Sequence, residues 1–549
     1  MASDRCESKN MLKQSIKLLA RFGSLSIFIL AGIAIFITWA YSWGDHQQQY
    51  IATATILIIA TPLAFTHFLL FSNRPLRKRL YISIAALLVV GTICGLFRIA
   101  EVSGDLVPRL AFRWQSPHEE SLPSLESAEV PAETSLAGGD EGLPATRRAT
   151  ADYPQFLGPN RDGVIPKVSI DWDWENYPPE EIWRRKVGPA WSSFAVSGYR
   201  AVTQEQRGAL ELVVCYRLDT GHIIWSHSDS ARFENVLGGI GPRATPTISG
   251  GRVYTMGATG ILNCLELADG REIWSVEVLK DNSCPNQEWG KSCSPLLTGE
   301  LVVVAGGGYE CPGLLAYERE SGQEAWRSAL PNFGEFAEGV LGPGAGYSSP
   351  ALATIAGTPQ ILLLNHNTVT ANNPSNGAVL WSHPWPGSNP KVTQPVPASK
   401  DRILVSSGYG LGAELFEVQR DEQGAFTTSS IWKNRNLKSK FANIVIHEEN
   451  AYGLDDGIMV CIDLQTGKRR WKGGRYGHGQ LILAGDMLLV MTERGEMALV
   501  KPDTAGLKEV AKIQMIEGKS WNHPALAPPY LLVRNAREAA CYRLQGEGE

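Results

Sequence analysis

The sequence predicts an all-β protein: an eight-bladed β-propeller of four-stranded antiparallel blades, preceded by an N-terminal region of three transmembrane helices. Three observations predict this architecture. A glycine–tryptophan phrase recurs at intervals of about 50 residues, which is typical of propeller blades. A second series of small and polar residues recurs eight times, and three uncharged apolar runs precede both series.

The apolar runs predict three transmembrane helices within residues 24–100, at 24–43, 51–71 and 80–98. A signal peptide is the alternative for the first run, but three successive runs without a small-residue cleavage pattern disfavour it. Basic residues precede the first run and separate the second from the third, whereas residues 44–50 contain neither Lys nor Arg. This asymmetry places residues 1–23 in the cytoplasm and everything after residue 98 on the periplasmic or extracellular side of a bacterial inner membrane.

Residues 101–151 are predicted to be a flexible linker. Residues 116–150 contain no aromatic residue, and they are rich in acidic residues, proline and serine. Such a composition cannot bury enough apolar surface to fold. The propeller is expected to occupy residues 152–549.

The repeated phrase places a glycine four residues before a tryptophan. It occurs five times, as LDTGHIIW (218–225), LADGREIW (267–274), RESGQEAW (319–326), PSNGAVLW (374–381) and LQTGKRRW (464–471). The glycine predicts a hairpin turn with positive φ, and the tryptophan on the returning strand is expected to pack between neighbouring sheets. Two degenerate copies, Gly424 with Trp432 and Gly506 with Val510 in the tryptophan position, bring the count to seven hairpins.

The eighth blade is predicted to join the two ends of the domain. Residues 181–187 supply a tryptophan strand without a preceding hairpin, and residues 539–544 supply a strand without a following one. Pairing them closes the ring and removes both free edges. The tryptophans expected to dock blades, and not to form a ligand stack, are Trp183, Trp225, Trp274, Trp326, Trp381, Trp432 and Trp471.

The second series marks the start of the innermost strand of each blade, at the central channel. Small and polar residues suit that crowded axis, and proline is tolerated where a strand begins. Any ligand site is therefore expected at the channel mouth, where flat aromatic faces, cations and amides suit a polar planar or anionic ligand. The alternative is a hydrogen-bond network that plugs the channel. The candidate residues are Trp191, Arg243, Lys291, Tyr347, Gln394, Asn443, Arg475, His478, Trp521 and His523.

Metal and redox sites have weak sequence support. His478 and His523 lack an evident third ligand, and no CxxC pair marks a zinc site, so no metal ligand is assigned. Asp455 and Asp456 precede Gly457, which favours a polar turn over a calcium or base pair. Of nine cysteines, Cys284 and Cys293 share a loop and could form a disulfide in an oxidising compartment. The net charge of −5 argues against nucleic-acid binding.

The glycine–tryptophan hairpins of residues 152–545 resemble the repeats of pyrroloquinoline quinone (PQQ) dehydrogenases and of the outer-membrane assembly lipoprotein BamB. The segments YPQFLGPNRDGV (153–164), YGLDDGIMVCIDLQTGKRRWKGGRYGHGQ (452–480) and KSWNHPAL (519–526) look like those of bacterial PQQ-binding-like β-propeller repeat proteins. The resemblance to quinoprotein alcohol dehydrogenases implies PQQ under an adjacent cysteine pair, with a calcium ion held by Glu, Asn and Asp. The chain has no Cys-Cys dipeptide and no CxxCH haem motif.

Two functions follow from the resemblance. A BamB-like member would be a noncatalytic, membrane-anchored extracytoplasmic scaffold that binds another envelope protein, a peptide or a ligand, with no cofactor and no catalytic residue. The alternative is a PQQ- and calcium-dependent oxidoreductase that feeds electrons to the membrane. The missing cysteine pair favours the scaffold. A membrane sensor is a weaker idea, because no cytoplasmic signalling domain supports it.

Overall fold

The computed structural model describes residues 23–41, 46–116, 118–122, 149–307, 311–329, 346–387 and 389–546. The chain divides into two compact units, Met1–Ser116 and Pro117–Glu549. Residues 1–22 of the predicted cytoplasmic segment 1–23 and the linker residues 123–148 lie outside the described ranges.

The first unit contains three helices long and apolar enough to cross a membrane, as predicted: Gly23–Ala40, α2 (His46–Phe71) and α3 (Leu76–Leu96). The third helix begins earlier than the predicted residue 80, so the basic cluster that follows Pro75 occupies its first turn. It ends at Leu96 because Phe97 adopts an extended backbone, with φ −114° and ψ 151°. Within this unit, the Ser24 hydroxyl donates to Ala64 O at 3.1 Å and so links two helices through a polar contact.

The beginning of the predicted linker is folded, which corrects the expectation of flexibility from residue 101. Strands β1 (Phe97–Val102) and β2 (Pro108–Phe112) form an antiparallel hairpin. In the second unit, the short 3-10 helix η1 (His118–Ser121) contacts the propeller. Its His118 Nε2 lies 2.9 Å from Val187 O, and its Glu119 carboxylate forms an ion pair with Arg232 at 2.9 Å. Side-chain contacts thus hold this part of the segment in place, although composition alone indicated a tether.

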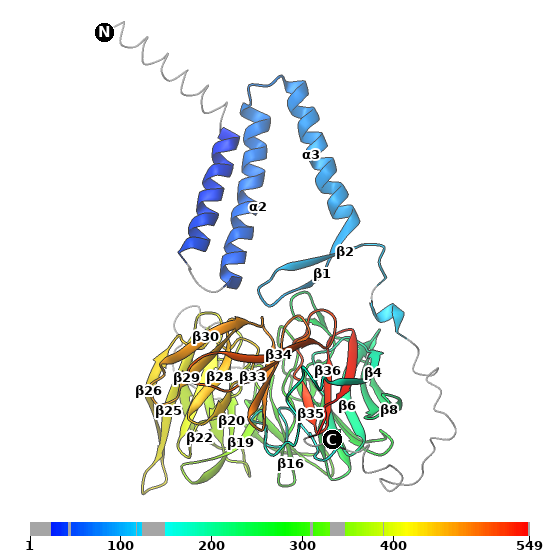
Figure 1. Cartoon of the computed structure of the whole chain (residues 1–549), viewed down its shortest axis with the longest axis vertical. Helices are drawn as coiled ribbons and strands as arrows, with labels where there is room; N and C mark the ends of the chain where they lie inside the picture. The colour runs from blue at the N-terminus through cyan, green and yellow to red at the C-terminus, as the bar shows by residue number, and fades with distance from the viewer. Residues whose placement is uncertain are drawn as a thin grey trace. The chain divides into compact units, whose positions relative to one another are not determined.

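The second unit is the predicted eight-bladed propeller, and each of its first four blades is a four-stranded antiparallel meander (Figure 1). Their strands are, in blade 1, β5 (Ala195–Ser197), β6 (Arg200–Arg207), β7 (Leu210–Arg217) and β8 (Ile223–Asp229); in blade 2, β11 (Thr247–Ser249), β12 (Arg252–Met256), β13 (Ile261–Glu266) and β14 (Glu272–Glu277); in blade 3, β15 (Leu296–Thr298), β16 (Leu301–Ala305), β17 (Leu314–Glu318) and β18 (Glu324–Ser328); and in blade 4, β19 (Ala351–Ile355), β20 (Thr358–Leu364), β21 (Thr368–Asn372) and β22 (Val379–Pro384).

The remaining blades follow the same order, and a short strand, β3 (Val164–Ile165), adds in parallel to blade 7. Their strands are, in blade 5, β23 (Val396–Pro397), β24 (Arg402–Ser407), β25 (Gly412–Arg420) and β26 (Phe426–Asn434); in blade 6, β27 (Val445–His447), β28 (Asn450–Asp455), β29 (Ile458–Asp463) and β30 (Arg469–Arg475); in blade 7, β31 (Gln480–Ala484), β32 (Met487–Met491), β33 (Glu496–Lys501) and β34 (Lys508–Gln514); and in blade 8, β35 (Ala525–Ala527), β36 (Tyr530–Arg534), β37 (Glu538–Arg543) and β4 (Glu180–Lys186).

Blade 8 confirms the predicted closure by the two ends of the domain. The early strand β4 pairs antiparallel with the last strand, β37, and places Trp183 opposite Cys541. Figure 1 shows β4 beside the red C-terminal strands. Because the outermost strand comes from the start of the domain, the ring cannot open without breaking this sheet.

Five of the predicted docking tryptophans pack on the turn glycine of the next blade: Trp183, Trp225, Trp274, Trp326 and Trp432. Trp183 Nε1 donates to Leu218 O at 2.8 Å, and the Trp183 ring covers Gly221 so closely that an added Cβ would lie 2.6 Å from it. The same arrangement joins Trp225 to Gly270, where an added Cβ would lie 2.4 Å from the ring. Two features therefore require glycine at this turn position: its positive φ and the indole ring packed on its α-carbon.

A β-bulge precedes every tryptophan position and locates that position in the blade that lacks tryptophan. In blade 1 the register shifts between Cys215 and Tyr216, immediately before the pair Cys215–Trp225 is formed. In blade 7 the same shift lies between Leu499 and Val500, and Leu499 pairs with Ala511. The tryptophan position is therefore Ala511 and not Val510. Blade 8 has no hairpin between its two outermost strands, so no turn glycine is present there to receive a tryptophan.

Blade 5 is a second exception. Its strands β25 and β26 are nine residues each, and they carry the turn at Gly424 beyond the reach of Trp381. Trp381 Nε1 donates instead to the Gln360 side chain within its own blade, at 2.7 Å. The degenerate spacing of the Gly424–Trp432 copy thus corresponds to a longer hairpin.

Replacing Gly270 by alanine is expected to destabilise the propeller more than replacing Gly251. Both residues have nearly equal φ, +75° and +74°, but no atom lies within 4 Å of a Cβ at Gly251. Gly251→Ala should cost about 1–2 kcal/mol from backbone strain alone. Gly270→Ala should cost about 2–5 kcal/mol, because the Trp225 ring must also move. Urea unfolding of the full chain, followed by tryptophan fluorescence, measures both, and equal midpoints would contradict the docking role.

Candidate functional site at the channel mouth

The starts of the eight innermost strands are joined in a ring of hydrogen bonds around the axis. Ser193 N donates to Thr245 Oγ1 at 3.1 Å, Thr245 N to Ser294 Oγ at 2.9 Å, and Ser294 N to Ser349 Oγ at 2.9 Å. Each blade thus binds a side chain of the next. The equivalent positions, here called the channel ring, are Ser193, Thr245, Ser294, Ser349, Gln394, Asn443, Gln480 and His523.

Longer side chains complete the other half of the channel ring. Gln394 donates through Nε2 to Ser349 O at 3.0 Å, and its backbone N–H donates to Asn443 Oδ1 at 2.9 Å. Asn443 Nδ2 lies 3.3 Å from His523 Nε2, and His523 O accepts from the Ser193 hydroxyl at 2.6 Å. In this half of the channel ring, amide and imidazole side chains therefore make the contacts between strand starts that serine and threonine make in the first half. Three predicted site residues, Gln394, Asn443 and His523, belong to this ring.

The N-terminal segment of the propeller closes one side of the channel ring. Ile248 N donates to Pro154 O at 2.8 Å, and the Phe156 ring meets His523 edge-on at 5.0 Å. Arg161 is buried and donates to Ser294 O at 3.0 Å and to Pro295 O at 2.9 Å. Burial lowers the pKa of Arg161 to about 10, so it stays charged near neutral pH. The segment contacts ring residues and the residues that follow them, and so forms a floor under the axis.

An aromatic collar lies on the other side of the ring, formed by three residues that precede ring positions and by Tyr409 from the loop between β24 and β25. The collar comprises Trp191, Tyr409, Phe441 and Trp521, all partly exposed. The Trp521 ring centroid lies 4.9 Å from that of Trp191 and 5.0 Å from that of Phe441. Glu493 fixes Trp521 by accepting from its Nε1 at 2.9 Å. The rings therefore form a continuous, held surface.

Two lysines lie over the collar. Lys519 Nζ is 4.0 Å from the Trp521 ring centroid and 4.8 Å from that of Trp191. Lys440 Nζ is 4.8 Å from the Tyr409 centroid and 5.6 Å from that of Phe441. These distances are within the range of cation–π attraction. The collar thus combines aromatic faces with positive charge.

A second aromatic cluster adjoins the collar through the small hairpin of β9 (Glu234–Asn235) and β10 (Gly239–Ile240). Trp191 Nε1 donates to Gly238 O at 2.6 Å, and a Cβ on Gly238 would lie 3.1 Å from Trp289. The Trp289 ring lies 5.4 Å from Tyr347. Arg243 lies over Phe233 at 4.4 Å, and burial lowers the pKa of its guanidinium to about 10.

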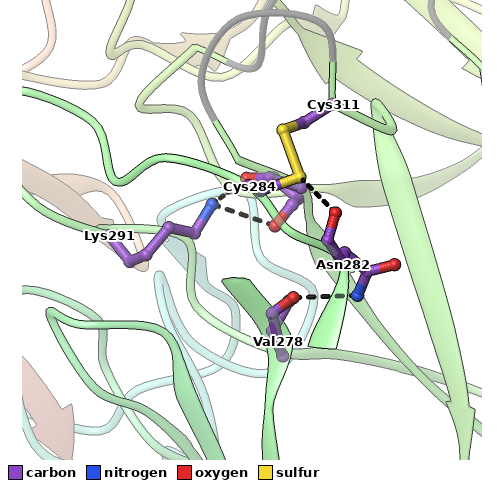
Figure 2. Close-up of a disulfide and its surroundings, with 7 residues drawn as sticks. Val278, Asn282, Cys284, Lys291 and Cys311 are labelled. Carbon is purple, nitrogen blue, oxygen red and sulfur yellow. Dashed lines mark hydrogen bonds between the residues drawn. A yellow bond between two sulfur atoms is a disulfide. The ribbon is translucent and has the colours of Figure 1, made fainter. Parts of the chain in front are cut away.

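The structure separates the remaining predicted residues. His478 packs edge-on against Phe441 at 5.5 Å, so it adjoins the collar. Lys291 is fully buried, where it donates to Ala305 O at 2.9 Å and also to Gly306 O (Figure 2). Burial lowers the pKa of Lys291 to about 8. Arg475 is exposed at the end of β30, the outermost strand of blade 6, and lies apart from the ring.

Sequence reasoning missed four residues of the collar and its cations: Tyr409, Lys440, Phe441 and Lys519. Phe441 lies within the eight-fold series but was not selected. A signal was present, because Lys440 immediately precedes Phe441 and Lys519 lies two residues before Trp521. Tyr409 offers no such signal, because it comes from the loop between β24 and β25.

The disulfide differs from the predicted pair. Cys284 bonds Cys311, with Cα atoms 5.9 Å apart (Figure 2). Cys293 is a buried free thiol. Cys293 directly precedes ring residue Ser294, and its sulfur accepts from Ala305 N at 3.1 Å. Its side chain therefore faces the core of blade 3, away from the loop that holds Cys284.

Asp455 and Asp456 act in structural ion pairs in addition to the predicted turn. Gly457 has φ +81°, as predicted. The buried Asp455 pairs with both Lys438 and Lys472, and Asp456 pairs with Lys438 at 3.0 Å. These carboxylates are consequently neutralised by lysines of blade 6 and the loop before it.

The residues at the axis do not fit a PQQ–calcium site. Calcium requires several oxygen ligands that usually include carboxylates. The channel ring holds hydroxyls, amides and an imidazole, which bind one another. The nearby Glu493 accepts from Trp521 and from His478 N at 3.2 Å. Among the described residues, no group of three or more His, Cys, Asp or Glu could hold a metal ion. The disulfide joins cysteines 27 positions apart instead of adjacent ones.

Residues 209–473 match the family model described as outer membrane protein assembly factor BamB. Over these residues the chain is similar to that family of PQQ-like β-propeller repeats. No curated protein sequence matches it. The structure of this PQQ-like propeller is similar to that of BamB from Moraxella catarrhalis, with 15% identity, a TM-score of 0.47, and coverage of 67% of this chain and 98% of that one.

A second solved structure shares the fold of this PQQ-like propeller. It is the quinohemoprotein alcohol dehydrogenase from Comamonas testosteroni, with 12% identity and a TM-score of 0.51. The similarity covers 74% of this chain and 82% of that one. At this identity the similarity establishes the fold alone.

Thiol counting tests the disulfide. Under non-reducing, denaturing conditions, seven of the nine cysteines should react with a maleimide, because two are bonded. Cys284→Ser should leave eight cysteines with all eight reactive, and should lower the stability by about 3 kcal/mol through loss of the cross-link. Cys293→Ser should leave eight cysteines with six reactive. Eight reactive cysteines in both variants would show instead that Cys284 pairs with Cys293.

The channel ring predicts an acid-sensitive stability through His523. Asn443 Nδ2 donates toward His523 Nε2, so the imidazole must be neutral to accept, and burial lowers its pKa from 6.5 to about 3. The unfolded chain therefore binds the proton first, and stability is lost as the pH falls from 6.5 towards 3. The loss should reach about 2–4 kcal/mol.

His523→Gln should remove that part of the pH dependence, as measured by urea midpoints at pH 4 and pH 7. The exposed His222→Gln is the matched control and should keep the wild-type slope. An unchanged slope in His523→Gln would contradict a neutral, buried His523.

Proposed function

We propose that this protein is a noncatalytic, membrane-anchored scaffold whose propeller, outside the cytoplasm, binds an extended segment of another envelope protein at the aromatic collar. The observation that carries this proposal is the collar itself: four partly exposed aromatic rings with two lysines over them, above a closed floor. Tryptophan and tyrosine are among the side chains that carry most of the binding energy of protein interfaces.

The closed floor favours a surface ligand over an enclosed cofactor. Arg161 and the channel ring fill the axis with groups that bind one another, and a cofactor in the channel would have to break those hydrogen bonds. A peptide that lies across the collar breaks none of them. The lysines favour a segment that carries acidic residues beside aromatic or proline side chains.

Membrane anchoring and orientation form the second part of the proposal. Three helices have the length and hydropathy of membrane spans. The basic cluster at the start of α3 favours the cytoplasm for that end, which puts the propeller on the opposite side. The disulfide Cys284–Cys311 suits an oxidising compartment there. The family model named for outer membrane protein assembly supports a partner in the cell envelope.

Site-specific photo-crosslinking in host cells tests the binding proposal. A benzophenone amino acid at Tyr409 of the collar should cross-link a partner protein, whereas the same group at exposed Tyr177 should not. Lys519→Ala should lower the cross-linked yield about five-fold or more, as expected for loss of roughly 1 kcal/mol of binding. Lys512→Ala is the matched control, because its amine lies 5.2 Å from the Tyr476 ring outside the collar. No cross-link at Tyr409, or equal effects of the two lysines, would contradict the proposal.

The quinoprotein alternative has its own outcome. The full-length protein is mixed with PQQ and Ca²⁺ and assayed for bound quinone absorbance and for dye reduction by alcohols or sugars. We expect no stoichiometric quinone. Quinone binding together with dye reduction would show that the protein is an oxidoreductase and would contradict the scaffold proposal.

A further inference from the structure

The hairpin of β1 and β2 continues directly from the third membrane helix. Helix α3 ends at Leu96, and β1 begins at Phe97. The helix has 21 residues, which at 1.5 Å per residue span about 31 Å, close to the thickness of a bilayer hydrocarbon core. If α3 crosses the membrane, Phe97 therefore lies at the boundary between the acyl chains and the headgroups.

Hydrogen bonds fix the hairpin to the end of that helix. The backbone N–H of Arg113 donates to Leu96 O at 2.8 Å, and the Arg113 side chain donates through Nε to Cys94 O at 2.9 Å. The N–H of Phe97 donates to Ile93 O. Carbonyls at a helix C-terminus lack partners within the helix, so these contacts satisfy them at a depth where water is scarce. The hairpin cannot move away from the boundary without exposing them.

One face of the hairpin is apolar and unusually exposed. The register pairs Phe97 with Phe112 and Ile99 with Leu110, which puts all four side chains on one face. Ile99 is 58% exposed and Leu110 is 55% exposed. Phe112 stacks on Phe97 at 4.7 Å and on Trp114 at 4.5 Å, and Trp114 is 66% exposed.

The opposite face is polar. Arg98 and Ala111 pair there, and Arg98 Nη2 donates to Gln115 O at 3.0 Å. Arg109 forms an ion pair with Glu101 at 2.9 Å. The hairpin is therefore amphipathic, with aromatic residues at the end next to the helix. Tryptophan and other amphipathic aromatic side chains concentrate at the headgroup level of membranes.

We propose that the β1–β2 hairpin is an interfacial anchor whose apolar face, made of Phe97, Ile99, Leu110, Phe112 and Trp114, inserts into the lipid headgroup region beside α3. The proposal rests on the membrane anchoring in the proposed function. Burial in this boundary removes the exposed apolar face from water, while the arginine face stays hydrated. The hairpin then fixes the point at which the chain leaves the membrane towards the propeller.

Fluorescence quenching in liposomes tests the anchor. Full-length protein with Cys6→Ser and Cys94→Ser carries one bimane label, at Leu110→Cys or at Ala111→Cys. The two positions are adjacent and lie on opposite faces of the same strand. We expect lipids brominated near the headgroup end of the acyl chains to remove about half or more of the fluorescence at Leu110→Cys. At Ala111→Cys, aqueous iodide should be the stronger quencher.

Two results would overturn the proposal. Iodide quenching of the Leu110→Cys label without bromine quenching would put the face in water, and shielding from both quenchers would put it against protein. Resistance of the reconstituted protein to alkaline extraction reports separately on the helices. Protein released by alkali would reject both the membrane anchoring and the hairpin anchor, whereas retained protein with no bromine quenching would reject the hairpin alone.

Discussion

The propeller depends on one repeated contact, the indole ring of one blade packed on the turn glycine of the next. Each ring removes a large apolar surface from water, and where its N–H meets a turn carbonyl, as at Trp183 and Trp225, it also fixes the rotation between blades. Loss of such a buried tryptophan typically costs about 3–5 kcal/mol. Five such contacts, each running from one blade to the next, fix these blades relative to one another.

The closure also builds the channel mouth. The segment that leads to β4 first crosses the propeller axis, where Arg161 binds carbonyls of blade 3 and Phe156 meets blade 8. The same stretch of chain therefore supplies both the floor of the channel and the outermost strand of blade 8. The proposed binding surface therefore lies above the channel ring. The collar there offers aromatic and cationic contacts but no cluster of carboxylates for a metal.

Three places depart from the tryptophan pattern and show what the pattern is for. Ala511 stands where blade 8 has no hairpin, and Trp381 turns to Gln360 where the hairpin of blade 5 is too long. Trp471 likewise has no ring contact with Gly506, which has no atom within 4 Å of an added Cβ. In all three places the contact between an indole ring and a turn glycine of the next blade is absent. The glycine and the tryptophan are thus one unit, although about 40 residues separate Trp183 from Gly221 and Trp225 from Gly270.

The sequence by itself determined the eight blades, the closure between residues 181–187 and 539–544, and three helices of membrane length. These features follow from the spacing and hydropathy of residues along the chain, which do not depend on the tertiary structure. Only the tertiary structure decided the collar, the floor at Arg161, the bond from Cys284 to Cys311, and the hairpin after α3. The collar joins residues of blades 1, 5, 6 and 8, and its lysines are ordinary surface residues in sequence. The collar residues and their lysines come together only because each strand start brings them to the same side of the channel ring. Blade packing sets that geometry.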